Sequence, residues 1–176
     1  MKAKEICYVG LMVALITICS WISIPMTVPF TLQTFAVFVA VGVLGMKGGA
    51  MAVLTYMLLG AIGLPVFAGF SGGLGQLLGN TGGYIIGFFF SALVTGLVMK
   101  YFGKRPVVLV VGFAIGLLVC YIFGTAWFIY FYSNAKGAIG LATALSWCVT
   151  PFIIPDAIKI GLAVLVVKRV EKSVAL

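Results

Sequence analysis

Residues 107–132 read VVLVVGFAIGLLVCYIFGTAWFIYFY and contain no charged side chain. A helix needs about 20 residues to cross the ~30 Å hydrocarbon core of a bilayer, so this stretch is long enough to span one. The stretch therefore predicts that this part of the chain lies in a membrane.

The composition extends that prediction to the whole chain. Hydrophobic residues make up 64% of its 176 residues and charged residues only 8%, whereas an ordinary soluble domain carries roughly 25% charged residues. A domain of ~150 residues still leaves about 30% of its unfolded surface exposed, so one aqueous core cannot hide this many apolar side chains. Soluble globular and disordered proteins are both excluded, and we predict a single integral-membrane domain over residues 1–176.

Charges, prolines and glycine clusters divide the sequence into six apolar segments, so we predict an all-α membrane protein with six transmembrane helices. They cover residues 6–24, 30–46, 50–64, 82–100, 107–132 and 154–170. The first segment is longer than the core of a signal peptide and lacks a cleavage site, so we expect it to span the membrane. We expect the glycine-rich residues 65–81 to form an outer loop that packs inward, and residues 138–150 to form a short extra outer helix.

The basic residues predict the orientation. Six crossings place nine of the eleven Lys and Arg residues on the side that holds both termini; Lys136 lies on the other side and Lys159 on neither. The positive-inside rule then puts both termini in the cytoplasm. The net charge of +8 is explained in this way, and we expect the bilayer, not nucleic acid, to be the partner of these charges.

Several kinds of chemistry are excluded by what the sequence lacks. Without histidine there is no Ser-His-Asp triad, no Cys-His pair and no His-ligated metal site, and we expect no bound metal. The glycine run at residues 69–75 is not GxxxxGK[ST] and follows no predicted strand, so the chain cannot hydrolyse ATP through a P-loop. The four cysteines form no CxxC pair and are expected to be small buried hydrophobes.

Asp156 and Lys159 are the leading candidates for a binding site. They lie in PFIIPDAIKIGLAVLVV (151–167), and Asp156 is the only acid within the predicted transmembrane region. A spacing of three residues puts both side chains on one helix face. Charges within membrane spans are costly and usually face a cavity or a partner. The pair therefore predicts a ligand site, although a purely structural ion pair is the alternative.

Three other polar or aromatic positions are weaker candidates. Asn80 precedes the fourth segment and either caps its helix or makes a polar contact in an outward-facing pocket. Gln33 lies one turn into the second segment and either contacts ligand or bonds another helix. Aromatic residues are plentiful near the outer face, and one or two of them could stack on a flat ligand: Phe30, Phe67, Phe70, Tyr84, Trp127 and Tyr130.

Gly10 and Ala14 form a small-xxx-small step in the first segment. Small residues at this spacing let another helix approach closely. The step therefore indicates either a docking surface for a partner or close packing within the chain.

Four stretches together resemble the BioY family, the biotin-binding S components of energy-coupling factor (ECF) transporters. These are PFTLQTFAV (29–37), LLGAIGLPVFAGFSGGLGQLLGNTGGYIIGF (58–88), GTAW (124–127) and PFIIPDAIK (151–159). The resemblance follows nearly the whole chain in order, and the 58–88 block is its most specific part.

The resemblance implies a non-enzymatic subunit of the bacterial cytoplasmic membrane that captures biotin from outside and has no cofactor of its own. It implies as partners a transmembrane coupling protein and two cytoplasmic ATPases, with Gly10 and Ala14 docking the coupling protein. It also implies a biotin site at Asn80, Asp156 and Lys159, to which we add Gln33 and Tyr84. An S component for another vitamin, or a stand-alone proton-coupled transporter using Asp156, remains an alternative.

Overall fold

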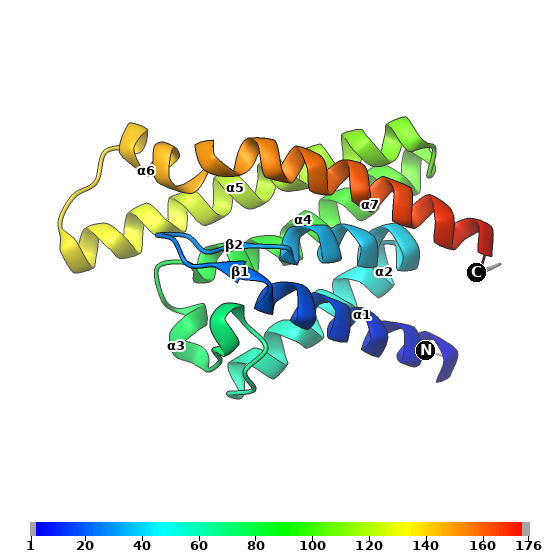
Figure 1. The fold of residues 1–176 in the computed structure, drawn as a ribbon, viewed down its shortest axis with the longest axis horizontal. Helices are drawn as coiled ribbons and strands as arrows, with labels where there is room; N and C mark the ends of the chain where they lie inside the picture. The colour runs from blue at the N-terminus through cyan, green and yellow to red at the C-terminus, as the bar shows by residue number, and fades with distance from the viewer. Residues whose placement is uncertain (1–2, 174–176) are drawn as a thin grey trace.

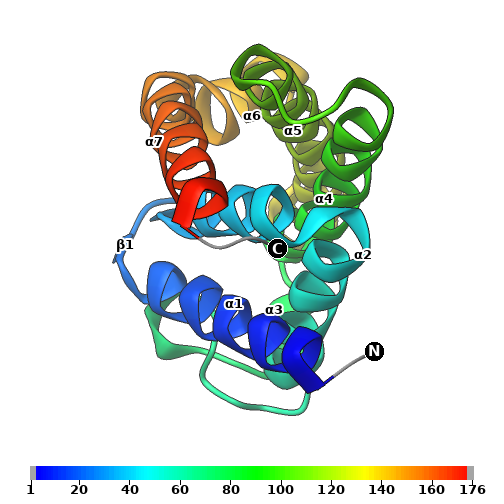
Figure 2. The same cartoon turned by 90° about the vertical axis from the view of Figure 1, so that its right-hand side faces the viewer.

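The computed structural model describes residues 3–173, and Figure 1 shows that helices make up most of the molecule. In chain order the elements are α1 (Ala3–Trp21), β1 (Ser23–Ile24), β2 (Phe30–Thr31), α2 (Gln33–Ala61), η1 (Ala68–Phe70), α3 (Leu74–Leu77), α4 (Gly82–Phe102), α5 (Pro106–Lys136), α6 (Leu141–Cys148), η2 (Thr150–Phe152) and α7 (Ile153–Ser173). In the end-on view of Figure 2, α2, α4, α5 and α7 surround a common interior, and α1 packs against α2 on its other side.

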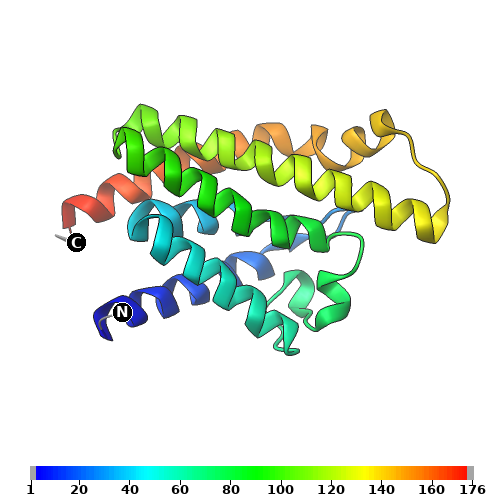
Figure 3. The same ribbon diagram turned by 180° about the vertical axis from the view of Figure 1, so that it is seen from behind.

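Helix α2 contains both the second and the third predicted segments. It is broken at Gly45, whose φ of 73° and ψ of −175° favour a residue without a side chain. The chain turns back at this point (Figures 1 and 3). The second predicted segment, 30–46, thus ends one residue past the break. The gap predicted at residues 47–49 is wrong, because the second half of α2 begins directly after Gly45.

Within residues 3–173, five helical stretches are long and apolar enough to cross a membrane. They are Ala3–Trp21, Gln33–Ala61, Gly82–Phe102, Pro106–Lys136 and Leu141–Ser173. The fifth stretch runs through both α6 and α7. The count is one lower than the six predicted segments because the two halves of α2 on either side of Gly45 count as one helix.

A short hairpin replaces parts of two predicted helices. Ser23 pairs with Thr31 and Ile24 with Phe30 in antiparallel register. Pro25 interrupts the chain between the strands and cannot continue a helix interior. The first helix therefore ends at residue 21 and α2 begins only at residue 33.

Helices α4 and α5 pack closely because small residues face large ones. A Cβ at Gly124 would overlap the ring of Tyr84. Pro106 stands in the first turn of α5, where its missing N–H costs no helical hydrogen bond. Gly137, with a φ of 100°, ends the helix. This close contact fixes the α4 side chains that face the interior.

The loop at residues 65–81 packs inward only in part. Phe67 is buried, and the Ser20 hydroxyl donates to the carbonyl of Val66 at 2.5 Å. Phe70 and Leu74, by contrast, are exposed. The expected short helix is confirmed as α6, within residues 138–150.

The two ends of the molecule differ in what they contain. The start of α1, the end of α7 and the α4–α5 connection lie at one end, whereas the hairpin, α3 and α6 lie toward the other (Figures 1 and 3). The predicted basic side and the predicted outer side are thus separated along the length of the bundle.

Candidate binding site

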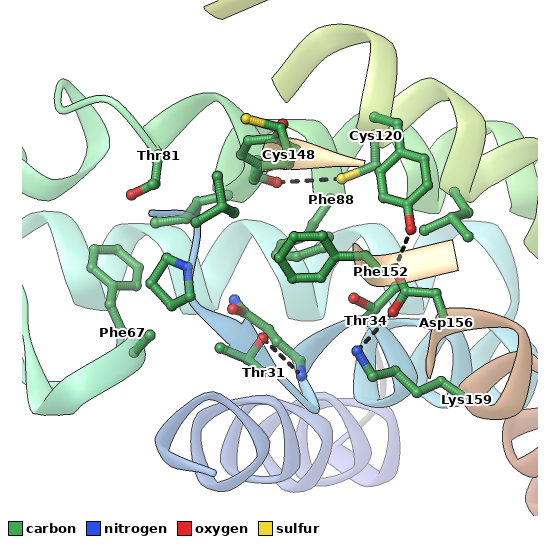
Figure 4. A pocket seen from close by; sticks show the side chains of 18 of the residues that line it. Thr31, Thr34, Phe67, Thr81, Phe88, Cys120, Cys148, Phe152, Asp156 and Lys159 are labelled. Atoms are coloured by element: carbon green, nitrogen blue, oxygen red, sulfur yellow. Dashed lines mark hydrogen bonds and ion pairs between the residues drawn. The ribbon is translucent and has the colours of Figure 1, made fainter. Parts of the chain in front are cut away.

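A cavity of about 110 Å³ lies between α2, α4, α5 and α7, and the hairpin and the 65–81 loop complete its wall (Figure 4). Its polar lining includes Thr31, Gln33, Thr34, Thr81, Asp156 and Lys159. Apolar and aromatic side chains such as Phe67, Phe88 and Phe152 form much of the remainder. A mostly apolar cavity with a few convergent polar groups is typical of a small-molecule site.

Asp156 and Lys159 form a buried ion pair in the wall of this cavity. Lys159 Nζ lies 2.7 Å from Asp156 Oδ1, and the side chains are only 4% and 3% exposed. Asp156 lies in the first turn of α7, where the positive end of the helix dipole favours a carboxylate. The structure thus brings together the two leading candidates, and both face the cavity.

Two aromatic residues complete the surroundings of the pair. The Tyr121 hydroxyl donates a 2.5 Å hydrogen bond to Asp156 Oδ2, and Lys159 Nζ lies 4.2 Å from the centroid of the Phe30 ring. Each oxygen of Asp156 therefore already accepts one hydrogen bond, and the ammonium lies over an aromatic face in a cation–π contact. The pair is held in one geometry from α5, α7 and the hairpin.

Gln33 and Tyr84 also line the cavity, but their polar atoms have partners in the protein. Gln33 Nε2 donates to the Tyr56 hydroxyl at 2.8 Å, and the hydroxyls of Tyr84 and Thr125 are 2.9 Å apart. Gln33 keeps its carbonyl oxygen for a ligand, because a side-chain amide has separate donor and acceptor ends. Tyr84 offers the cavity mainly its ring.

Asn80 is placed differently from the other candidates. It is half-buried in the turn before α4 and is not among the residues that line the cavity, whereas its neighbour Thr81 is. The turn is anchored by Trp127 Nε1, which donates to the carbonyl of Gly79 at 3.0 Å. A contact from Asn80 to a ligand in this cavity requires the turn to rotate.

The remaining aromatic candidates fall into two groups. Phe67 lines the cavity, and Phe30 covers Lys159. Phe70 and Tyr130 are exposed, at 64% and 66%. Trp127 instead supports the turn before α4. Among the aromatic candidates, Phe67, Phe30 and Tyr84 are therefore the ones placed to stack on a molecule in the cavity.

Gly10 and Ala14 lie on an exposed face of α1 and not in the site. No atom lies within 4 Å of the place that a Cβ on Gly10 would occupy. The small-xxx-small step is therefore not used for packing within residues 3–173, and this face is open to another helix.

Tyr121 is the main site residue that the sequence reasoning missed. A tyrosine in the middle of an apolar span needs a hydrogen-bond partner for its hydroxyl, and that requirement was an available signal. Thr34 and the residues at the α6–α7 junction, Cys148 and Phe152, were also missed. They reach the cavity only through the tertiary arrangement.

The arrangement suits binding of a neutral or anionic molecule with polar ends and an apolar middle. The ion pair offers an acceptor and a donor side by side, and aromatic side chains line the wall around it. Among the described residues, no three His, Cys, Asp or Glu side chains lie close enough together to hold a metal ion.

Comparison with known proteins gives a consistent result. The sequence matches the BioY family over residues 1–176. It is 42% identical over 172 residues to a probable biotin transporter BioY of Pyrococcus horikoshii, covering 97% of this chain and 98% of that one. It is 41% identical over 170 residues to the biotin transporter BioY of Thermotoga maritima, covering 96% of each.

A solved structure gives the same result for the fold. The crystal structure of the S-component for biotin from an ECF-type ABC transporter superimposes with a TM-score of 0.85 at 32% identity, covering 97% of this chain and 92% of that one.

Proposed function

The chain belongs to the BioY family of membrane transport proteins, which are not enzymes, and from this we propose that it captures biotin as the S component of an ECF transporter. The observation that carries the proposal is the buried Asp156–Lys159 pair in the wall of a mostly apolar cavity. Biotin has a ureido ring, an apolar sulfur ring and chain, and a terminal carboxylate, so it too is polar at both ends and apolar between.

The locked geometry of the pair favours the ureido ring as its partner. One edge of that ring carries an N–H donor beside a C=O acceptor, and the pair presents a carboxylate beside an ammonium at 2.7 Å. Asp156 accepts from the ureido N–H, and one of the remaining N–H groups of Lys159 donates to the ureido carbonyl. A buried site of this kind rejects analogues that lack these groups, because its own polar atoms would be left unpaired.

The biotin carboxylate then lies toward the 65–81 loop, where Thr81 and Gln33 contribute polar groups.

The competing arrangement pairs Lys159 with the biotin carboxylate. Biotin methyl ester separates the two, since it lacks the negative charge but keeps the ureido ring. A salt bridge from Lys159 to the carboxylate would make the ester much the weaker ligand for the native protein, and Lys159→Gln would remove that difference.

A ligand as large as biotin requires this cavity to enlarge. A cavity of about 110 Å³ is smaller than the ~300–1,000 Å³ that ligand sites usually provide. Gly63, Gly69 and Gly73 have positive φ angles, and no atom lies within 4 Å of the place that a Cβ on any of them would occupy. We propose that residues 63–81 open and close on these glycines, and that closure brings Asn80 to the ligand.

The proposed partners follow from the proposal that the chain is the S component of an ECF transporter. Six crossings, counting the halves of α2 separately, put both termini in the cytoplasm next to a coupling protein and two ATPases. Gly10 and Ala14 on the open face of α1 then dock the coupling protein. Gly10→Leu is expected to abolish co-purification with the coupling protein and to leave biotin binding unchanged. Gly161→Leu, on an open face of α7, is the matched control.

The identity of the ligand that co-purifies with the protein tests the proposal. Mass spectrometry of the extracted small molecules is expected to find biotin at about one molecule per chain. Another vitamin at that ratio would make this an S component of different specificity. Uptake by vesicles that contain this chain alone, driven by a pH gradient without ATP, would instead support a stand-alone proton-coupled transporter.

A further inference from the structure

A second cavity, of about 350 Å³, lies at the end of the molecule opposite the binding site. Its walls include Lys47, Lys100 and Lys104, together with Met46 and Met99. We propose that this cavity binds the phosphate of an anionic phospholipid. The proposal does not depend on the transported ligand.

The three lysines come from different elements and meet at one place. Lys47 follows the Gly45 break in α2, Lys100 lies in the last turn of α4, and Lys104 is in the α4–α5 connection. The Gly45 break is what places a residue of α2 here, because the chain reverses at the height where α4 ends.

The charge of the cavity is mostly uncompensated. Among residues 3–173, the salt bridge that involves one of these lysines joins Lys104 to Glu171 at 3.7 Å. Lys104 also donates to the carbonyl of Val43 at 3.4 Å. No salt bridge joins Lys47 or Lys100 to a carboxylate among the described residues. A phosphate here would therefore give these two lysines charge-assisted hydrogen bonds.

An apolar groove adjoins the lysines and favours a phospholipid over a soluble phosphate. This groove, of about 630 Å³, shares Leu44 and Lys47 with the lysine cavity, and its walls include Met51, Leu54 and Phe89. Its wall also holds one carboxylate among the described residues, that of Glu5 in the first turn of α1. A soluble phosphate would use only the lysines, whereas a phospholipid would also place an acyl chain in the groove.

The neighbouring surface fits the same interpretation. Tyr101 and Phe102 directly follow Lys100 and are 74% and 71% exposed. Aromatic side chains concentrate at the level of lipid headgroups. Basic pockets between membrane helices are a known means of holding anionic headgroups. The lysines therefore lie at a depth where phosphates are present.

Native mass spectrometry of the detergent-purified full chain tests the proposal. Titration with dioleoylphosphatidylglycerol is expected to give one retained lipid at low concentration, and dioleoylphosphatidylcholine is not. Lys47→Gln/Lys100→Gln is expected to weaken phosphatidylglycerol retention by about fivefold for each lysine. Arg169→Gln/Lys172→Gln removes the same charge at the same end but outside the cavity, and it should retain the lipid like the native chain.

Each other outcome overturns the proposal. Equal retention of the two lipids would show that the site does not select a charge. Equal weakening by both double variants would show that net charge, not this cavity, attracts the lipid. Displacement of the lipid by glycerol phosphate at comparable concentration would assign the site to a soluble phosphate. Unchanged lipid retention with loss of the coupling protein would assign the lysines to protein docking.

Discussion

Replacing Asp156 with Asn tests whether the ion pair is as buried as the structure shows. The side chains of Asp156 and Lys159 are 3% and 4% exposed and 2.7 Å apart. Removing the carboxylate leaves a buried ammonium without its counter-ion, which typically costs about 3–5 kcal/mol. Lys159→Gln leaves the Asp156 carboxylate buried without its counter-ion and should lower the free energy of unfolding by a similar amount.

The double variant Asp156→Asn/Lys159→Gln shows whether the single variants are unstable because of an unpaired buried charge or because of lost side-chain contacts. Replacing both members of a buried pair by well-packed hydrophobic residues is often close to neutral for stability, and the large cost arises when one charge is left uncompensated. Asn and Gln together leave no uncompensated charge and can hydrogen-bond to each other. The thermal midpoint of the double variant is therefore expected near that of the native chain, while each single variant melts well below it. Tryptophan fluorescence during heating of the detergent-solubilised protein measures all four proteins.

Biotin affinity is expected to behave differently from stability. Both single variants and the double variant lose a charge-assisted hydrogen bond to the ureido ring, worth about 1.5–3 kcal/mol. That is roughly a 10- to 150-fold weaker Kd. The recovered stability of the double variant shows that its lost affinity is not a folding defect.

A matched pair elsewhere in α7 supplies the control. Lys168 and Glu171 have the same spacing and a 2.8 Å contact, but their side chains are 34% and 28% exposed. Lys168→Gln/Glu171→Gln and its single variants should each change stability by no more than about 1 kcal/mol. Two results would show that the pair is not buried in this way: Asp156→Asn melting like the native chain, or a double variant destabilised by the sum of the single effects.

Three further predictions concern the surroundings of the pair. Tyr121→Phe removes the hydroxyl that donates to the buried carboxylate of Asp156, and thermal melting should show a stability loss of about 1.5–3 kcal/mol. Calorimetry should show a smaller loss of biotin affinity than Asp156→Asn causes. Gly124→Ala pushes a methyl group into the Tyr84 ring and should cost about 1–3 kcal/mol and weaken biotin binding, whereas Gly161→Ala, on an open surface, should do neither. Amide hydrogen exchange in residues 63–81 should slow when biotin is bound, and equal exchange with and without biotin would contradict the proposed lid.

The broad fold could be predicted because it depends on composition and charge position. The charge-free stretch at 107–132 lies within α5, and the short extra helix predicted within 138–150 is α6. The reversal at Gly45 could not be placed, because glycines also stand at positions 42, 48 and 49 and only packing selects the one that turns. The hairpin was missed because two-residue strands carry almost no periodicity.

The charged part of the site could be predicted because a charged side chain in a membrane span is energetically unfavourable unless it is paired or faces a cavity. A lone acid and a base three residues away had to face a cavity or each other, and in the structure they do both. Tyr121 could not be assigned to the pair, because the approach of α5 to α7 is not encoded in either helix alone. Asn80 was predicted as a site residue but does not line the cavity, whereas its neighbour Thr81 does. A polar residue in a turn carries no energetic requirement to face a cavity, so its direction could not be predicted.

Calorimetric titration of the full chain with biotin shows whether the protein binds biotin through the Asp156–Lys159 pair. The protein should be produced in biotin-depleted medium, because ligand carried over from the host would mask the sites. We expect saturable binding of about one biotin per chain, weakened at least tenfold in the well-folded Asp156→Asn/Lys159→Gln variant. The absence of binding to ligand-free protein, or the same Kd in both proteins, would contradict this expectation.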